Sequence, residues 1–174
     1  VAVTPTTTAT GGTVTYAWTN DNAAIGLAAS GTGAIPAFTA INTGTAPVTA
    51  TITVTPTFTN GGISCVGTVR TYTITINPTA TVNTVSNQVI CNGSASAAVN
   101  FSTTATGGTV TYAWTNSNTT IGLSASGSGN IASFTATNNG TAPAIATITV
   151  TPTFTNDGVS CQGTAQTFTI TVNP

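Results

Sequence analysis

The amino-acid sequence predicts an all-β protein made of two β-sandwich modules in tandem. Three observations predict this fold: the chain repeats itself at an offset of 96 residues, apolar and polar residues alternate along most segments, and no segment shows the apolar spacing of a helix. A unit of this length matches one independently folding sandwich, whereas solenoid repeats span roughly 20 to 50 residues. Each repeat is therefore expected to fold as a separate module.

The repeat covers Thr8–Pro78 and Thr104–Pro174, which align without a gap and share 52 of 71 residues. The run TATGGTVTYAWTN is identical in both copies, and each copy closes on Asn-Pro. The predicted domains are therefore residues 1–78 and residues 79–174, joined with almost no linker. Two successive copies of one module make the chain an array.

The first module is expected to be truncated at its start. Val1 aligns with Ala97, so nothing in the sequence of the first module corresponds to residues 79–96. The first strand of the module would lie in that segment. We interpret the chain as a window taken from a longer array.

Alternation with a period of two predicts the strands of the complete second module. They fall at residues 81–90, 97–103, 109–116, 121–125, 131–137, 144–155 and 165–172. Apolar side chains such as Ile148, Val150 and Phe168 occupy one face of these segments, while threonine fills most of the other. Threonine is β-branched and polar, so it suits the solvent face of a strand. Gly-Gly and Asn-Gly pairs mark the turns.

Seven short strands with a tryptophan on the third are typical of an immunoglobulin-like sandwich. Trp114 holds this position, and Trp18 is its equivalent in the first module. Both are predicted to fill the centre of a core, because a residue this large is usually highly buried. Stacking against a ligand is the alternative interpretation of both tryptophans.

Only three side chains carry a charge at neutral pH: Asp21, Arg70 and Asp157. Ordinary soluble domains are about one quarter charged, whereas here threonine, with 45 of the 174 residues, takes over the solvation of the surface. One arginine cannot provide the basic footprint that nucleic acids or anionic membrane surfaces require. No stretch of about 18 apolar residues is present to cross a membrane as a helix. We therefore expect neither nucleic-acid binding nor membrane insertion.

The sequence offers no catalytic centre and no site for a cofactor. Catalysis needs a general base, an activated nucleophile or a metal ion, and the chain has no histidine and only two side-chain carboxylates. Asp157 aligns with Gly61. Asp21 aligns with Ser117, so neither carboxylate recurs in the repeat as a calcium ligand would. The predictions are no enzyme, no cofactor and no metal site.

Cysteine has two positions in a complete repeat. Cys65 and Cys161 are equivalent and precede the last strand, while Cys91 follows the first strand. A Cys91–Cys161 disulfide would close a loop of about 70 residues and contribute on the order of 4 kcal/mol in the chain-entropy model. In a standard sandwich, however, the turn after the first strand and the hairpin before the last strand lie at opposite ends of the module. Each cysteine would then form its disulfide with a cysteine of a neighbouring module. Both pairings, and free thiols, stay open; Cys65 is expected to pair outside this chain.

Several stretches of the chain resemble a known family of repeats. They are NQVICNGSASAAVNF, YAWTN, IGLSASGSGNIASFTATN, GTAPAIATITVTPTFTN and the closing TFTITVNP. Together they look like the PKD-like or immunoglobulin-like repeats of giant cell-surface proteins of Bacteroidota, such as gliding adhesins of the SprB type. The resemblance covers the entire chain. It implies an extracellular array on the cell surface, secreted by the type 9 system, with no catalytic residues.

The repeat and the resemblance predict a structural role, as a segment of a long surface filament or adhesin stalk that serves adhesion or gliding motility. The expected partners are neighbouring repeats of the same chain. Strands without charged edge residues also favour lateral self-assembly into a filament.

The alternative function is weak binding by every repeat, to glycan such as a surface polysaccharide or to ice, strengthened by multivalency. Regular rows of threonine prompt the ice interpretation, although sandwich sheets are twisted. The aromatic candidates for stacking on sugars all fall on the predicted core face: Tyr16, Phe58, Tyr72 and Phe154.

Overall fold

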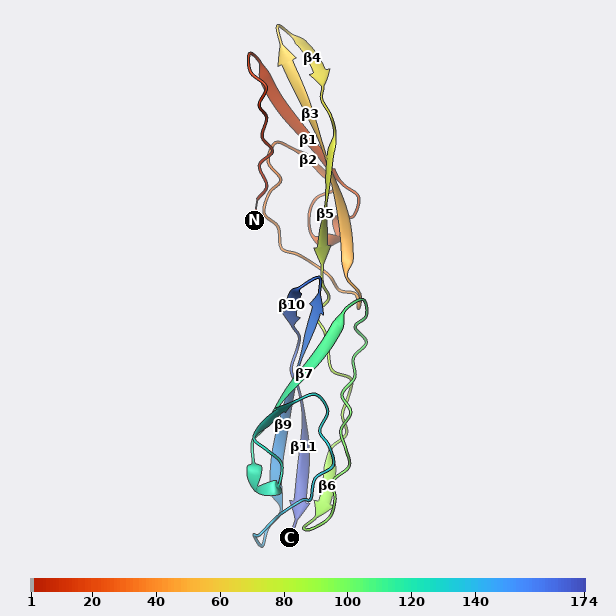
Figure 1. Cartoon of the computed structure of the whole chain (residues 1–174), viewed down its shortest axis with the longest axis vertical. Coiled ribbons are helices and arrows are strands. Elements are labelled where there is room, and N and C mark those ends of the chain that lie inside the picture. Colours follow the sequence, from red (N-terminus) through yellow and green to blue (C-terminus); the bar gives the residue numbers. More distant parts are fainter. Residues whose placement is uncertain (1) are drawn as a thin grey trace. The chain divides into compact units, whose positions relative to one another are not determined.

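The computed structural model describes residues 2–174, and the chain divides into two compact units. Unit 1 is Val1–Ile76 and unit 2 is Asn77–Pro174. In Figure 1 unit 1 runs from red to yellow-green and unit 2 from green to blue. Each unit is all-β, and the predicted immunoglobulin-like sandwich class is confirmed.

The boundary between the units falls two residues before the predicted one, because Asn77 is bonded into unit 2. Its side-chain amide donates to the carbonyl of Val159 (3.3 Å), and its side-chain oxygen accepts from the amide of Asn156 (3.1 Å). Pro78 follows and is fully buried. The closing Asn-Pro pair of one repeat therefore contributes to the structure of the next unit.

Unit 1 contains one five-stranded antiparallel sheet, in the order β2-β1-β3-β4 with β5 also paired to β3. At 13 residues, β3 is long enough to pair with β1 along one edge and with both β4 and β5 along the other. The elements are β1 (Thr13–Asn20), the 3-10 turn η1 (Ala23–Ile25), β2 (Ser30–Thr32), β3 (Val48–Asn60), β4 (Ile63–Val66) and β5 (Arg70–Ile76).

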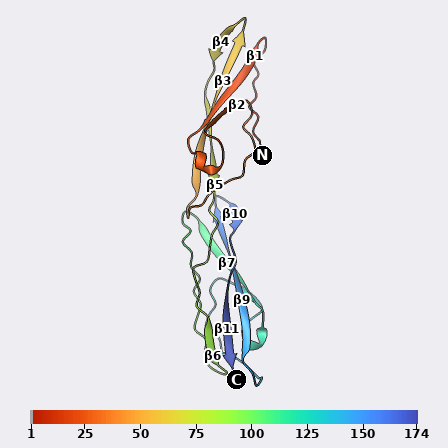
Figure 2. The ribbon, with the colours of Figure 1, turned by 180° about the vertical axis from the view of Figure 1, so that it is seen from behind.

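Unit 2 repeats this sheet and adds one strand. The order is β6-β11-β9-β7-β8, with β10 paired to β9, and β6 runs parallel to β11 along the outer edge. Figure 2 shows β6 beside β11 from the reverse side. The elements are β6 (Gln88–Cys91), β7 (Thr109–Asn116), η2 (Thr119–Ile121), β8 (Ser126–Ser128), β9 (Ala144–Asn156), β10 (Val159–Gln162) and β11 (Gln166–Asn173).

Extended stretches with isolated bridges form the layer that faces each sheet. In unit 2 Val99 bridges Ile131 and Ala95 bridges Thr135. In the described residues of unit 1, one isolated bridge joins Val3 to Ile35. The predicted strands at 97–103 and 131–137 are therefore paired only through isolated bridges, although they contribute the buried side chains of Val99, Phe101 and Ile131 to the core.

Two other predicted strands of unit 2 were wrong in part. Residues 121–125 are not a strand: the Asn118 side chain caps the 3-10 turn by accepting from the Thr120 amide (3.1 Å), and Gly122 ends it at φ 92°. A capping asparagine and a left-handed glycine outweigh the alternation of apolar residues there. Of the predicted strand 81–90 only the end is regular, within Gln88–Cys91. β10 (Val159–Gln162) lies between the predicted strands 144–155 and 165–172 and was not predicted.

Each core is built around its tryptophan, as predicted. Trp18 is 3% exposed and Trp114 is 7% exposed. The glycine opposite each of them, Gly31 or Gly127, lies against the indole ring, where an added Cβ would overlap it. This close approach explains why a glycine stands opposite the tryptophan in both copies.

Candidate interaction surfaces

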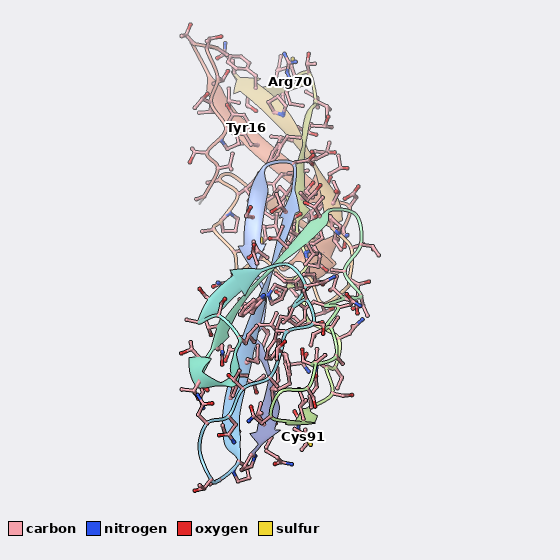
Figure 3. All side chains as sticks on the ribbon, turned by 60° about the horizontal axis from the view of Figure 1, so that its bottom comes forward. Tyr16, Arg70 and Cys91 are labelled. Atoms are coloured by element: carbon pink, nitrogen blue, oxygen red, sulfur yellow. The ribbon has the colours of Figure 1, made fainter. Side chains whose placement is uncertain are left out.

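A groove with a volume of about 630 Å³ opens on the core of unit 1. Its walls come from β1, β3, β5 and the first residues of the chain. Its lining includes Val3, Tyr16, Val54, Pro56, Arg70 and Tyr72. Figure 3 labels Tyr16 and Arg70, which contribute an aromatic ring and the only basic side chain of the protein to this groove.

The groove contains polar atoms that are buried without partners. The hydroxyl groups of Tyr16 and Tyr72 are both out of contact with water, and neither has a hydrogen-bond partner among the described residues. Burial also raises the pKa of the Tyr72 hydroxyl above 10.0. Leaving a buried hydroxyl unpaired costs about 1–3 kcal/mol. Unit 2 likewise holds one such atom, the indole nitrogen of Trp114.

In unit 2 the matching place is occupied by the chain before β7. The carbonyl of Ala80 accepts from the Thr164 amide (3.2 Å), and the Asn87 side chain accepts from the Thr169 amide (2.8 Å). β6 then continues along the edge of β11, with Gln88 opposite Ile170. Val82 from this stretch is buried in the core.

A second surface is the outer threonine face of each sheet. Threonines of neighbouring strands stand opposite one another, and two such hydroxyl contacts are Thr49–Thr75 (3.1 Å) and Thr59–Ser64 (2.8 Å). The threonine pairs across the β3 ladders are Thr13–Thr59, Thr15–Thr57, Thr19–Thr53, Thr49–Thr75, Thr51–Thr73 and Thr53–Thr71. The face offers hydroxyl groups at regular spacing without charge.

The cysteines are free thiols, so the Cys91–Cys161 disulfide weighed above is not formed. Cys91, labelled in Figure 3, stands opposite Asn173 at the end of β11. Cys161 stands opposite Phe154 on β9. About ten residues of β9, or about 33 Å, separate these two levels of the sheet. A disulfide needs Cα atoms within about 7 Å, which the fold of unit 2 does not permit. Cys65, the equivalent of Cys161, lies exposed on β4.

The two aspartates form no metal site among the described residues. Asp21 accepts from the Thr51 amide (2.6 Å), and Asp157 occupies a turn at φ 48°. Within residues 2–174 no three histidine, cysteine, aspartate or glutamate side chains gather as a metal site would need. The same residues include no helix with the length and apolar character to cross a bilayer.

The groove was not predicted. The alternation places Tyr16 and Tyr72 on the core face, where the structure also has them, but it does not say whether that core is closed. One signal within the repeat marks this place: Arg70 aligns with Gln166, so that a charge stands where the other copy has a neutral amide.

No protein-family model and no curated protein sequence matches this chain.

Proposed function

We propose that this chain is a repeat segment of a long extracellular surface filament or adhesin stalk, with a mechanical role in adhesion or gliding motility. The resemblance of its repeats to those of giant adhesins of Bacteroidota prompted this proposal. The observations below support it without depending on that resemblance.

The supporting observation is that the chain enters and leaves unit 2 at opposite ends of its longest strand. Asn77 is bonded beside the β9–β10 hairpin, at Asn156. The last strand ends beside Ala144, at the other end of β9, where Val172 pairs with it. Twelve residue steps of extended chain span about 40 Å. A unit with this path extends an array by its own length each time it is repeated.

The composition suits such an array. Because the outer faces are solvated by threonine hydroxyls, their hydration does not depend on salt or on pH in the range where carboxylates and amines titrate. Tight junctions, in which Asn77 already belongs to the next unit, leave no free linker of the kind that separates independent binding domains. Both features fit a spacer on a cell surface.

Electron microscopy of concatenated repeats tests the proposal. Arrays of two, four and six copies of residues 79–174 should appear as thin strings whose contour grows by a constant step of about 40 Å or more per copy. Antibody labelling of the repeat on intact source cells should decorate the surface. Collapsed particles, or labelling only after lysis, would contradict the proposal.

A second candidate function is weak, multivalent binding through the threonine face. The ladder of paired hydroxyls, present on both units, favours it. Glycan arrays and ice-affinity partition with the two-unit chain decide this candidate. Retention on either matrix that rises steeply with copy number supports binding by the repeat, and no retention at high protein concentration leaves the mechanical role alone.

A further inference from the structure

The first long strand of each sheet leaves half of its outer edge without a partner strand. In unit 2 all eight residues of β7 pair with β9, but on the other side β8 pairs only with residues 113–115. In unit 1 β2 covers the same half of β1, at residues 17–19. Among residues 2–174, no strand pairs with the outer edge of residues 109–111 or of residues 13–15.

This open edge belongs to the repeat itself and recurs in both units. Unit 2 contains residues 79–96 and follows unit 1 in the chain, and the edge of its β7 is open all the same. Unit 1 is followed by unit 2, and the edge of its β1 is open over the equivalent residues. Both strands read TVTYAWTN and show the same alternation of exposed and partly buried side chains. Neither the stretch before a module nor the module after it covers this edge.

The backbone of Val14, and of its equivalent Val110, points toward the open edge. In an antiparallel ladder the N–H and C=O of one residue point to the same side, and the side alternates from one residue to the next. The Tyr16 carbonyl accepts from the Gly33 amide (2.8 Å), on the side of β1 that faces away from β3. Val14 lies two residues earlier, so both of its backbone groups face the same way. Among the described residues, no hydrogen bond reaches the outward backbone groups of Val14 or Val110.

The sequence of the edge does not protect it from another strand. Natural sheets protect an open edge with charged side chains, with proline or with a bulge. The stretch TVTYAWTN has no charged residue and no proline, and its valine, threonine and aromatic residues favour strands. An added strand therefore meets unpaired backbone groups and no repulsive charge.

A hollow beside the open edge of unit 1 has room for the side chains of such a strand. Its volume is about 530 Å³, and its lining includes Val14 and Thr15 of the edge and Thr57 of β3. Thr15 and Thr57 stand opposite one another on the outer face of the sheet. Side chains that an added strand presents on this face would lie against the hollow.

The same edge on another copy of the chain is the partner that fits. Two such edges, placed antiparallel with Val14 opposite Val14, exchange two N–H···O bonds, because each residue directs both a donor and an acceptor outward. In this register Thr13 of each copy stands opposite Thr15 of the other, which continues the threonine pairs already present between β1 and β3. The net charge of −1 on the whole chain leaves little repulsion between copies.

One contact of this kind is weak, and each chain can make two. The open edge is only three residues long in each unit, so a single pairing buries little surface. A chain with two units carries two such edges, and every further repeat adds one. The affinity between chains should therefore rise steeply with the number of repeats.

We propose that the open edges of β1 and β7 are lateral association sites, at which a second copy of this chain adds its own edge in antiparallel register. The partner is another copy in preference to a foreign peptide, because the identical edge brings the same uncharged ladder on each of its units. The proposal goes beyond the stalk and stands without it, since the association of purified chains is measured whether or not arrays are extended on a cell.

Analytical ultracentrifugation of the full chain measures the association, under reducing conditions that keep its cysteines as thiols. We expect reversible self-association with a Kd of about 0.1–1 mM. Two full chains joined end to end should associate at least about tenfold more tightly, because they carry twice as many edges. Amide hydrogen exchange, compared at low and high protein concentration, locates the contact. The amides of Val14 and Val110 should exchange more slowly at high concentration.

Matched charge variants separate the edge from a general tendency to associate. Thr15→Lys combined with Thr111→Lys places one charge beside each open edge and should weaken association at least about tenfold. The control combines Thr53→Lys with Thr149→Lys, which adds the same charges on β3 and β9. These two threonines have a paired strand on each side. The control should therefore associate like the unmodified chain.

A second pair of variants removes the outward donors themselves. Val14→Pro combined with Val110→Pro deletes the two amide hydrogens that face the open edges and leaves the bonds to β3 and β9 in place. This variant should sediment as a monomer at every concentration tested. Fluorescence of the buried tryptophans reports whether each variant is folded.

Three results would each overturn the proposal. The first is a chain that stays monomeric up to about 1 mM, both singly and when two chains are joined. The second is an equal loss of association in the edge variant and in the control variant of matched charge. The third is association that slows exchange elsewhere in the chain and leaves Val14 and Val110 unchanged.

Discussion

Units 1 and 2 share nearly all of their strands yet differ in how well their cores are closed. The equivalents Val54 and Val150 come from the same position of the same long strand, and Val150 is fully buried whereas Val54 is only partly buried. Within the described residues, the stretch from Asn77 to Ser96 packs on unit 2, and no described stretch takes the equivalent place on unit 1. The comparison teaches that the ladder of strands forms from the repeat itself, while closure of the core depends on one added edge strand.

The largest difference is expected when an aromatic side chain of the last strand is removed. Phe168→Ala should cost unit 2 about 3–5 kcal/mol, because the ring is buried and leaves a cavity. Tyr72→Ala in unit 1 should cost about 1–2 kcal/mol, because its ring already meets water. Urea unfolding is followed by the fluorescence of a single tryptophan. Trp114→Phe leaves Trp18 to report unit 1, and Trp18→Phe leaves Trp114 to report unit 2. Equal losses of unfolding free energy in the two variants would contradict the difference in core closure between the units.

A smaller but sharper difference is expected for the glycine before the last strand. Gly163→Ala should destabilise unit 2 by about 1–3 kcal/mol, since the new Cβ meets the carbonyl of Ala80. Gly67→Ala should cost unit 1 less than about 1 kcal/mol, since its Cβ meets Pro56 at 3.0 Å and only a small shift is needed. The same unfolding measurement applies. A cost in unit 1 as large as in unit 2 would show that the Ala80 stretch is not the cause.

The two units should respond alike where the added strand plays no part. Asn20 and Asn116 are both buried, and each donates to the carbonyl of the leucine seven residues later at 3.0 Å. Replacing either with alanine should cost about 2 kcal/mol, because buried carbonyls lose their donor. Thermal unfolding of the two variants should agree within about 0.5 kcal/mol. A clear disagreement would mean that the units differ beyond their edge strands.

The smallest effect concerns alkaline pH. Burial raises the pKa of Tyr72 above 10.0 in the folded state, so the unfolded chain loses this proton first as the pH rises. The stability from this group is therefore complete below pH 10 and falls as the pH climbs past 10 toward the folded pKa. Tyr72→Phe, which copies Phe168, should remove this loss from unit 1. Melting curves between pH 8 and pH 11 check it, and an unchanged alkaline loss in the variant would contradict it.

Much of the fold could be predicted because threonine alternates with apolar residues along β3 and β9, a pattern that specifies both the strand and its buried face. The tryptophan cores follow from the same pattern. The 3-10 turn at Thr119–Ile121 was missed, because its cap depends on side-chain hydrogen bonds from Asn118 and outweighs the local alternation.

The groove could not be predicted from alternation, which assigns Tyr72 to a core without saying whether that core is closed. Closure depends on a contact distant in sequence: Thr169 is held by Asn87, 82 positions away. The absence of the Cys91–Cys161 disulfide could not be predicted either, because it depends on the strand register. That register places the two cysteines at the levels of opposite ends of β9.

The measurement that tests this comparison most directly is hydrogen exchange of the unmodified chain under native conditions, read amide by amide in the two last strands. Thr73 and Thr169 are equivalent, and the Thr169 amide donates to the Asn87 side chain at 2.8 Å, whereas among residues 2–174 no side chain accepts from the Thr73 amide. We expect the β5 amides to exchange faster than those of β11, with unit 1 opening at a lower free energy than unit 2. Equal protection of β5 and β11 would contradict the claim that residues 77–96 close the sandwich.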